Sequence, residues 1–196
     1  MNLDPETTAV IAIHCQGDIV GPDGAFAPLF HDQVVERSVI GKVASLQKLA
    51  RHSGMKVIYT RIAWKPDYSD LQANSPLLQN VMQMGCLKEG SPQSDIIDQL
   101  APHPGDLVVT HQRVSGFSSE LQHALQEQGI DTLLFCGVAT NVSVESTARA
   151  ASDAGYNVVL VEDACSAASI NAHQATVESL AMLGEVTTVE ELQRKL

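Results

Sequence analysis

Short apolar runs alternate along this chain with segments whose apolar residues recur at helical spacing. Each run is too short for a helix and is typical of a strand buried on both faces. The runs lie at residues 7–15, 56–63, 106–110, 132–138, 157–162 and 186–188. The helical segments lie at residues 33–52, 92–100, 118–128, 141–154 and 171–183, with a last helix from about residue 189. Because such alternation requires right-handed crossovers, it predicts a three-layer α/β/α fold with a mainly parallel sheet.

Two segments interrupt this alternation. Residues 16–28 are rich in Gly and Pro and follow the first predicted strand as a loop. Residues 64–90 are polar and poorly periodic, and loops of this length in compact domains are usually lids, binding loops or interface segments. We expect residues 64–90 to cover a pocket and to contribute to a subunit interface.

Length and charge narrow the class of protein. The 196 residues, 44% of them hydrophobic, suffice for one domain over residues 1–196. The net charge of −11 argues against nucleic-acid and anionic-membrane partners, which require a basic surface. The acidic start has neither the basic nor the apolar region of a signal peptide, and no apolar run approaches membrane-spanning length. We therefore expect a cytoplasmic protein.

The four cysteines are Cys15, Cys86, Cys136 and Cys165. They lie far apart and form no C-x-x-C pair, which fits neither a zinc site nor a disulfide framework. We expect buried free thiols.

The stretch 132–150 combines the features of a ligand site. An apolar run ends at Gly137 and Val138, and the polar pair Thr140-Asn141 then begins a predicted helix. Ligands of open parallel sheets bind beyond the carboxyl ends of the strands, where the first N–H groups of a helix are free. The turn that contains Ser143 should therefore line a pocket.

This stretch also carries a family resemblance. Residues 137–151, GVATNVSVESTARAA, resemble the isochorismatase-like hydrolases, a superfamily that includes nicotinamidases and other small-amide hydrolases. That family usually reads G-V/A-x-T-N-x-C-V-x-x-T-A-x-x-A. Residues 110–121, THQRVSGFSSEL, are similar to its K-x-R-x-S-A-F-x-x-T-x-L, and His14-Cys15-Gln16 stands where its first strand ends in Asp-x-Gln. The likeness covers almost the whole chain.

The resemblance implies several properties. It implies a six-stranded sheet of order 3-2-1-4-5-6, a small-molecule substrate and a homo-oligomer such as a dimer or tetramer. It also implies a cis peptide bond between Val138 and Ala139. The substrate-binding and oxyanion positions that match the family are Gln16, Arg113, Phe117, Val138, Ala139, Thr140 and Asn141.

The catalytic positions depart from the family. Its Asp, Lys and Cys correspond here to His14, His111 and Ser143. A serine hydroxyl needs a well-placed base and an oxyanion hole, and one neutral imidazole can take its proton while the other orients it. This set lacks the carboxylate that usually fixes the imidazole tautomer.

These residues are compatible with three different functions. Ser143 can be the nucleophile of a small-amide hydrolase. A protonated His14 can instead donate a proton during hydrolysis of an isochorismate-like vinyl ether, with Ser143 only binding. The chain can also be a catalytically inactive member that binds a small molecule or partner.

A metal or nucleotide cofactor is not expected. The segment that supplies zinc ligands in nicotinamidase-type relatives, AWKPDYSDLQANSPL, contains no His, and His14 with His111 gives only two ligands. Neither a G-x-G-x-x-G turn nor a phosphate-binding G-x-x-x-x-G-K-S/T loop is present. The remaining histidines, His31, His52, His103, His123 and His173, are expected at the surface.

Overall fold

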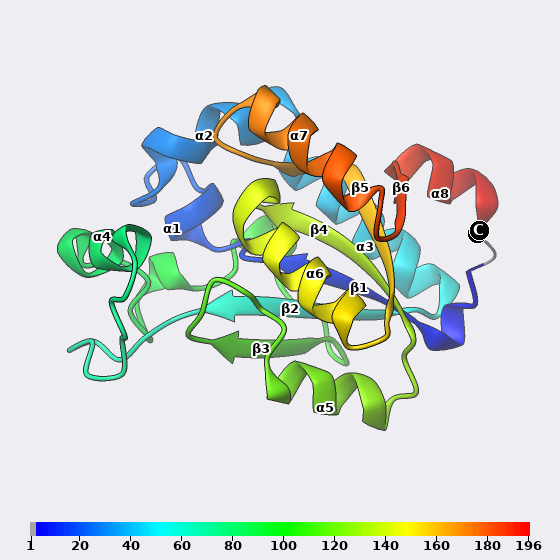
Figure 1. Cartoon of the computed structure of the whole chain (residues 1–196), viewed down its shortest axis with the longest axis horizontal. Coiled ribbons are helices and arrows are strands. Elements are labelled where there is room, and N and C mark those ends of the chain that lie inside the picture. The colour runs from blue at the N-terminus through cyan, green and yellow to red at the C-terminus, as the bar shows by residue number, and fades with distance from the viewer. Residues whose placement is uncertain (1–2) are drawn as a thin grey trace.

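The computed structural model describes residues 3–196 and centres on a six-stranded sheet (Figure 1). Every strand pair is parallel, and the order is β3-β2-β1-β4-β5-β6, as predicted. The strands are β1 (Thr8–Ile13), β2 (Lys56–Ile62), β3 (Leu107–His111), β4 (Thr132–Val138), β5 (Asn157–Ser166) and β6 (Glu185–Thr187). All six residues of β1 are buried, because β2 and β4 flank it and helices cover both faces.

Helices form the outer layers. They are α1 (Gly17–Val20), α2 (Ala27–Glu36), α3 (Val39–Ser53), α4 (Pro76–Met84), α5 (Ser119–Glu127), α6 (Glu145–Asp153), α7 (Ile170–Leu180) and α8 (Val189–Lys195). Figure 1 shows α6 in front of the sheet and α3 behind it. Helix α7 contacts α6, and α8 contacts α3, so the molecule has the three predicted layers.

The predicted helix over residues 33–52 was wrong in its bounds. The structure has two helices there, α2 and α3, which are separated at Arg37 and Ser38. Ser38 lies in the left-handed region with φ 53°, which ends the first helix although the apolar spacing continues across it. The predicted loop over residues 16–28 also contains α1 and the first two residues of α2.

Other boundaries also differ. Residues 64–90 contain α4, which begins where the Ser75 hydroxyl accepts from the Leu78 N–H and ends at Gly85. The predicted helix over 92–100 is two short 3-10 turns, Pro92–Ser94 and Asp98–Leu100. The fifth strand runs four residues further than predicted, to Ser166, while α7 ends at Leu180 rather than 183.

The elements around the site gather at one edge of the sheet. Figure 1 shows α1, α2 and α4 on the side toward which the arrowheads of β2 and β3 point. Within residues 3–196, no helix is both long and apolar enough to cross a membrane.

Candidate active site

The three residues that replace the family's triad lie at the carboxyl edge of the sheet. His14 follows the end of β1, His111 is the last residue of β3, and Ser143 lies in the turn after β4. His14 has φ 50°, a left-handed conformation that is uncommon for a residue with a side chain. All three residues are largely buried, with relative exposures of 2%, 6% and 7%.

His14 and His111 form a direct pair. Their Nε2 atoms lie 3.0 Å apart, and their rings are stacked with centroids 5.0 Å apart. Because one nitrogen must donate and the other accept, the pair holds a single proton between these two atoms. His111 Nδ1 is buried and has no hydrogen-bond partner among the described residues.

Burial keeps both imidazoles neutral near pH 7. It lowers the pKa of His14 well below its ordinary value, and the neighbouring His111 lowers it further. Burial also lowers the pKa of His111 to about 4, an effect that the Arg113 backbone opposes only in part. The site therefore offers an uncharged proton acceptor rather than a standing imidazolium.

Ser143 lies in a π-helical turn, Thr140–Val144, that leads into α6. The peptide bond between Val138 and Ala139 just before it is cis, as the resemblance implied. The Ser143 carbonyl accepts from the Thr147 hydroxyl at 2.6 Å, and that hydroxyl accepts from the Gly116 N–H at 2.8 Å. The segment after β3 is thus tied to the serine turn. The Ser143 hydroxyl itself has no hydrogen bond among residues 3–196.

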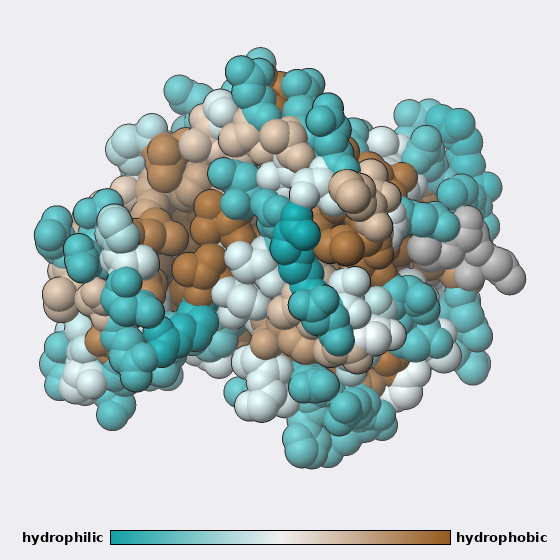
Figure 2. Space-filling view, in the orientation of Figure 1, coloured by the Kyte–Doolittle hydropathy of each residue, from teal (hydrophilic) through white to brown (hydrophobic). Residues whose placement is uncertain are grey.

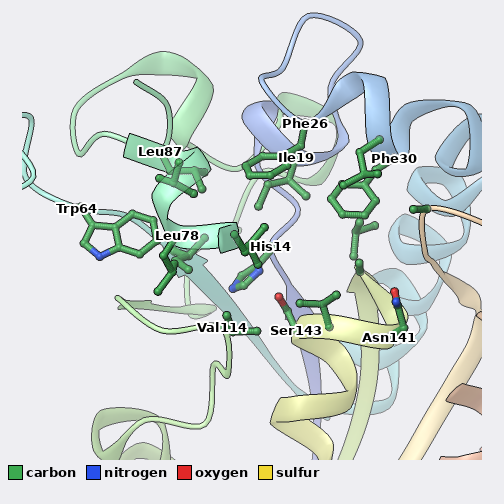
Figure 3. A pocket seen from close by; sticks show the side chains of 18 residues that line it. His14, Ile19, Phe26, Phe30, Trp64, Leu78, Leu87, Val114, Asn141 and Ser143 are labelled. Atoms are coloured by element: carbon green, nitrogen blue, oxygen red, sulfur yellow. The ribbon is translucent and has the colours of Figure 1, made fainter. Parts of the chain in front are cut away.

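A cavity of about 180 Å³ opens in front of His14 and Ser143. Figure 3 shows the His14 ring and the Ser143 side chain directed toward the same space. Of the predicted binding residues, Val138, Ala139 and Asn141 line this cavity. The structure therefore brings the turn after β4 and His14 together around one pocket.

Four predicted binding residues lie outside the cavity lining. The Gln16 side-chain amide makes all its hydrogen bonds within the protein. Its Nε2 donates to the carbonyls of Ile62 and Ser94, and its Oε1 accepts from the Ile62 N–H. Arg113 is exposed and hydrogen-bonds Gln72. The Phe117 ring packs edge to face on Tyr156, with centroids 5.7 Å apart.

Thr140, the fourth of these, belongs to a buried polar cluster behind the turn. Its hydroxyl lies 2.9 Å from Nδ1 of His173. Arg37 holds the other side of that ring, with its guanidinium 2.9 Å from His173 Nε2 and from the Glu162 carboxylate. His173 is only 2% exposed, so its predicted surface position was wrong. The cluster fixes the turn that carries Ser143.

The buried carboxylate of Asp18 joins the two segments that form the apolar pocket wall. Asp18 Oδ2 accepts from the Leu87 N–H at 2.7 Å, and Oδ1 accepts from the Ala25 N–H at 3.4 Å. This carboxylate therefore stabilises the fold by satisfying two backbone N–H groups. Among the described residues it makes no hydrogen bond to His14.

Part of the pocket wall was not predicted from the sequence. Residues 64–90 supply Trp64, Leu77, Leu78, Val81 and Leu87, which agrees with the expectation that this segment covers a pocket. The segment after β1, predicted only as a loop and a later helix, supplies Ile19, Phe26, Leu29 and Phe30. These residues are apolar like core residues, and only their proximity in space marks them as a binding wall.

The pair of histidines has no third metal donor nearby. Within residues 3–196, no three side chains of His, Cys, Asp or Glu gather in a way that suits a metal ion. Since the Nε2 atoms of His14 and His111 hydrogen-bond each other, the donor set favours proton transfer rather than coordination.

Comparison with known proteins finds relatives in one family of hydrolases. Residues 8–191 match the family model described as the isochorismatase domain. The chain is 35% identical over 174 residues to the ureidoacrylate amidohydrolase RutB of Azorhizobium caulinodans, covering 81% of this chain and 76% of that protein. It is 34% identical over the full length of both chains to the uncharacterized isochorismatase family protein YecD of Escherichia coli O157:H7.

A solved structure shares the whole fold. The cysteine hydrolase of Pseudomonas syringae pv. phaseolicola 1448A superposes with a TM-score of 0.90 at 28% identity, covering 100% of this chain and 94% of that one.

Proposed function

Since the chain belongs to the isochorismatase family of hydrolases, we propose that it cleaves a small amide with Ser143 as nucleophile and His14 as base. His111 is a positioning residue that acts through His14. One observation carries this proposal: a neutral, buried His14 ring and the unpaired Ser143 hydroxyl face one cavity. The amidohydrolase relative supports an amide as the scissile group.

The first half of the reaction transfers the acyl group. Ser143 Oγ attacks the amide carbon while His14 Nδ1 takes the hydroxyl proton, which leaves an oxyanion. The C–N bond then breaks, and His14 returns the proton to the leaving nitrogen as ammonia or an amine departs. An ester on Ser143 remains.

The second half releases the acid. A water molecule attacks the ester carbon while His14 takes its proton, and the C–O bond to Ser143 breaks as that proton passes to Oγ. In both halves the protonated His14 donates from Nε2 to the neutral Nε2 of His111, 3.0 Å away. His111 thus orients the imidazolium where a carboxylate does so in a Ser–His–Asp triad.

One observation favours a second candidate, a binding protein without turnover. The Ser143 hydroxyl makes no hydrogen bond to either imidazole among the described residues. Hydrogen bonds of this kind often tighten only when substrate is bound, which keeps the hydrolase as the better-supported function. A vinyl ether substrate is less well supported, because a proton donor is needed there and both rings are neutral.

The test is ammonia release from a panel of small amides by the purified protein. The wild type should release ammonia, and Ser143→Ala should reduce the rate to the uncatalysed background. Intact-protein mass spectrometry after acid quenching should detect an acyl adduct that Ser143→Ala does not form. Binding of an amide without any ammonia release would instead support the second candidate.

We also infer a cytoplasmic homo-oligomer without nucleic-acid partners. The four cysteines are free and buried, which suits a reducing compartment. The net charge of −11 disfavours nucleic acid. Exposed apolar side chains on α2 and α4, among them Val35, Met82 and Met84, are consistent with a subunit contact. Sedimentation as a monomer at micromolar concentration would contradict the oligomer.

A further inference from the structure

The cavity beside Ser143 is apolar on nearly every side. His14, Asn141 and Ser143 are the polar residues in its lining, and no Lys, Arg, Asp or Glu among the described residues contributes to it. In Figure 3 these three lie below and beside the space, while Ile19, Phe26 and Phe30 lie above it. One end of a bound molecule would therefore contact these polar groups, and the rest of it would contact apolar side chains.

The apolar wall continues to the entrance. Figure 2 shows brown, hydrophobic surface between α4 and the beginning of α6. Leu29 is 49% exposed and still lines the cavity, so it forms part of the rim. Phe26 and Phe30 stack on each other with centroids 6.1 Å apart and give the wall two aromatic rings. Such rings favour an aromatic or aliphatic group packed against them.

Among the described residues, no cationic side chain lines this cavity to pair with an anionic group. Arg113 is turned outward to Gln72, and the Lys88 ammonium lies over the Tyr68 ring, 5.1 Å from its centroid. The charged group next to the lining residue Ile19 is the carboxylate of Asp18, which has the same sign as an anionic ligand. A carboxylate that enters would lose its hydration without an ion pair in return, which is strongly unfavourable.

The size of the cavity limits the ligand as well. An apolar protein cavity of about 150 Å³ holds one benzene molecule. The cavity here, at about 180 Å³, has room for one ring or a short branched chain beyond the scissile group. Longer groups would have to pass between Leu29 and α4.

From these observations we propose that the site selects neutral amides whose acyl part is a hydrocarbon group of about the size of a phenyl ring, and that it discriminates against substrates bearing a carboxylate. This specificity rests on the proposed function, because it takes the cavity to hold the acyl group of the cleaved amide. Leu29 and the Phe26–Phe30 pair are its determinants, and Asn141 meets the polar end.

The experiment compares two ligands that share a ring. Calorimetry with the Ser143→Ala protein measures the dissociation constants of benzamide and of 4-carbamoylbenzoate, which adds one carboxylate. We expect benzamide to bind at least about tenfold more tightly, a difference of about 1.4 kcal/mol. Equal or tighter binding of 4-carbamoylbenzoate, or no binding of benzamide up to its solubility limit, would overturn the proposal.

A pair of variants tests whether the lining causes the discrimination. Leu29→Lys places an ammonium at the rim and should reduce the preference for benzamide at least about fivefold. Met182→Lys adds the same charge at a residue that is 86% exposed and does not line the cavity, so it should keep the wild-type ratio. An equal shift in both variants, or no shift in Leu29→Lys, would contradict a role for the rim.

Turnover by the wild type separates the two proposals. Preferential benzamide binding without ammonia release from any amide of the panel would contradict the amide hydrolase and leave only the binding preference for a neutral ligand standing. Ammonia release from 4-carbamoylbenzoate at a kcat/KM equal to or above that of benzamide would support the hydrolase and overturn the specificity.

Discussion

His14 and His111 meet through the same ring atom, Nε2, at 3.0 Å. A carboxylate in place of His111 would hold a fixed negative charge, but His111 is a neutral partner because burial lowers its pKa to about 4. When His14 takes a proton, the stabilisation comes from a hydrogen bond to an uncharged acceptor. This arrangement gives His14 the weak basicity of a buried imidazole.

The first prediction concerns catalysis. His14→Gln should lower kcat by about 10²- to 10⁴-fold, the usual contribution of a general base. His111→Phe keeps an aromatic ring but removes the acceptor, so we expect a smaller loss, and His111→Gln, which can accept a hydrogen bond, should recover part of it. Steady-state kinetics on the best amide found in the panel measures all three. Equal activity of His111→Phe and wild type would show that the imidazole pair has no catalytic role.

The second prediction concerns the pH profile of kcat/KM. Because the pKa of His14 is well below its ordinary value of about 6.5, activity should remain constant from pH 8 down through 6.5 and decline only at more acidic pH. Burial, the main cause of the low pKa of His14, remains in His111→Gln, so the acidic limb of this variant should also lie below 6.5. An acidic limb at 6.5 or above in the wild type would contradict a buried neutral base.

A third prediction links the same histidines to stability. In the folded state the pKa of His111 is about 4, whereas in the unfolded chain it is about 6.5, so the unfolded chain binds more protons between these values. The free energy of unfolding should therefore be highest above pH 6.5 and decrease as the pH falls toward 4. His111 alone contributes about 3 kcal/mol over this range. Urea unfolding at pH 7.5 and pH 5 measures the effect, and His111→Phe should show a smaller difference between the two pH values.

The fourth prediction tests the close approach of β1 and β4. Gly137 has φ 115°, and a Cβ on it would lie 2.1 Å from the backbone oxygen of Ile13. Gly137→Ala should therefore destabilise the fold by several kcal/mol, on the order of the largest single-residue effects. Gly41→Ala is the matched control, because, apart from its chain neighbours and the nearby backbone of its own helix, no described atom lies within 4 Å of the added methyl group, and alanine favours helix α3. The difference in urea midpoint between the two variants is the measurement, and equal midpoints would contradict the crowding.

The fifth prediction concerns the cluster behind the serine turn. The Arg37 guanidinium donates to the carbonyls of Cys165 and Glu162 and contacts His173. Arg37→Ala leaves these partly buried acceptors unpaired and should cost about 1–3 kcal/mol of stability. Arg194→Ala removes an ion pair with Glu190 whose side chains are 69% and 71% exposed, and it should change stability by less than about 0.5 kcal/mol. Equal effects of the two changes would show that the cluster does not support the turn.

The sheet was predictable because its signals are local and repeated. Each apolar run is short, and Gly54 after α3 marks a helix end, so the strands and their parallel pairing follow from pattern and connection rules. The break at Ser38 was not predictable in the same way. A left-handed serine carries no Gly or Pro signal, and the apolar spacing on both sides of it fits one continuous helix.

The site was predictable only where the family motif covers it. His14, His111 and Ser143 were selected through matching positions, although each residue type had changed, and the structure places His14 beside His111 and beside the cavity that Ser143 also lines. The burial of His173 was missed, because its partners Arg37 and Glu162 come from distant segments. The apolar wall after β1 was missed for a related reason: Ile19, Phe26 and Phe30 look like ordinary core residues until α1 and α2 are placed around the carboxyl edge of the sheet.

Asp18 gives the pocket one further property. Its two carboxylate oxygens accept hydrogen bonds from the backbone N–H groups of Ala25 and Leu87. A single side chain therefore links the apolar wall that follows β1 to the wall formed by residues 64–90. Neither wall can separate from the other without leaving a buried carboxylate unsatisfied, which is costly. Opening of the entrance is therefore a concerted event, and the two amides should exchange their hydrogens with solvent at similar rates, as members of one cooperative unit.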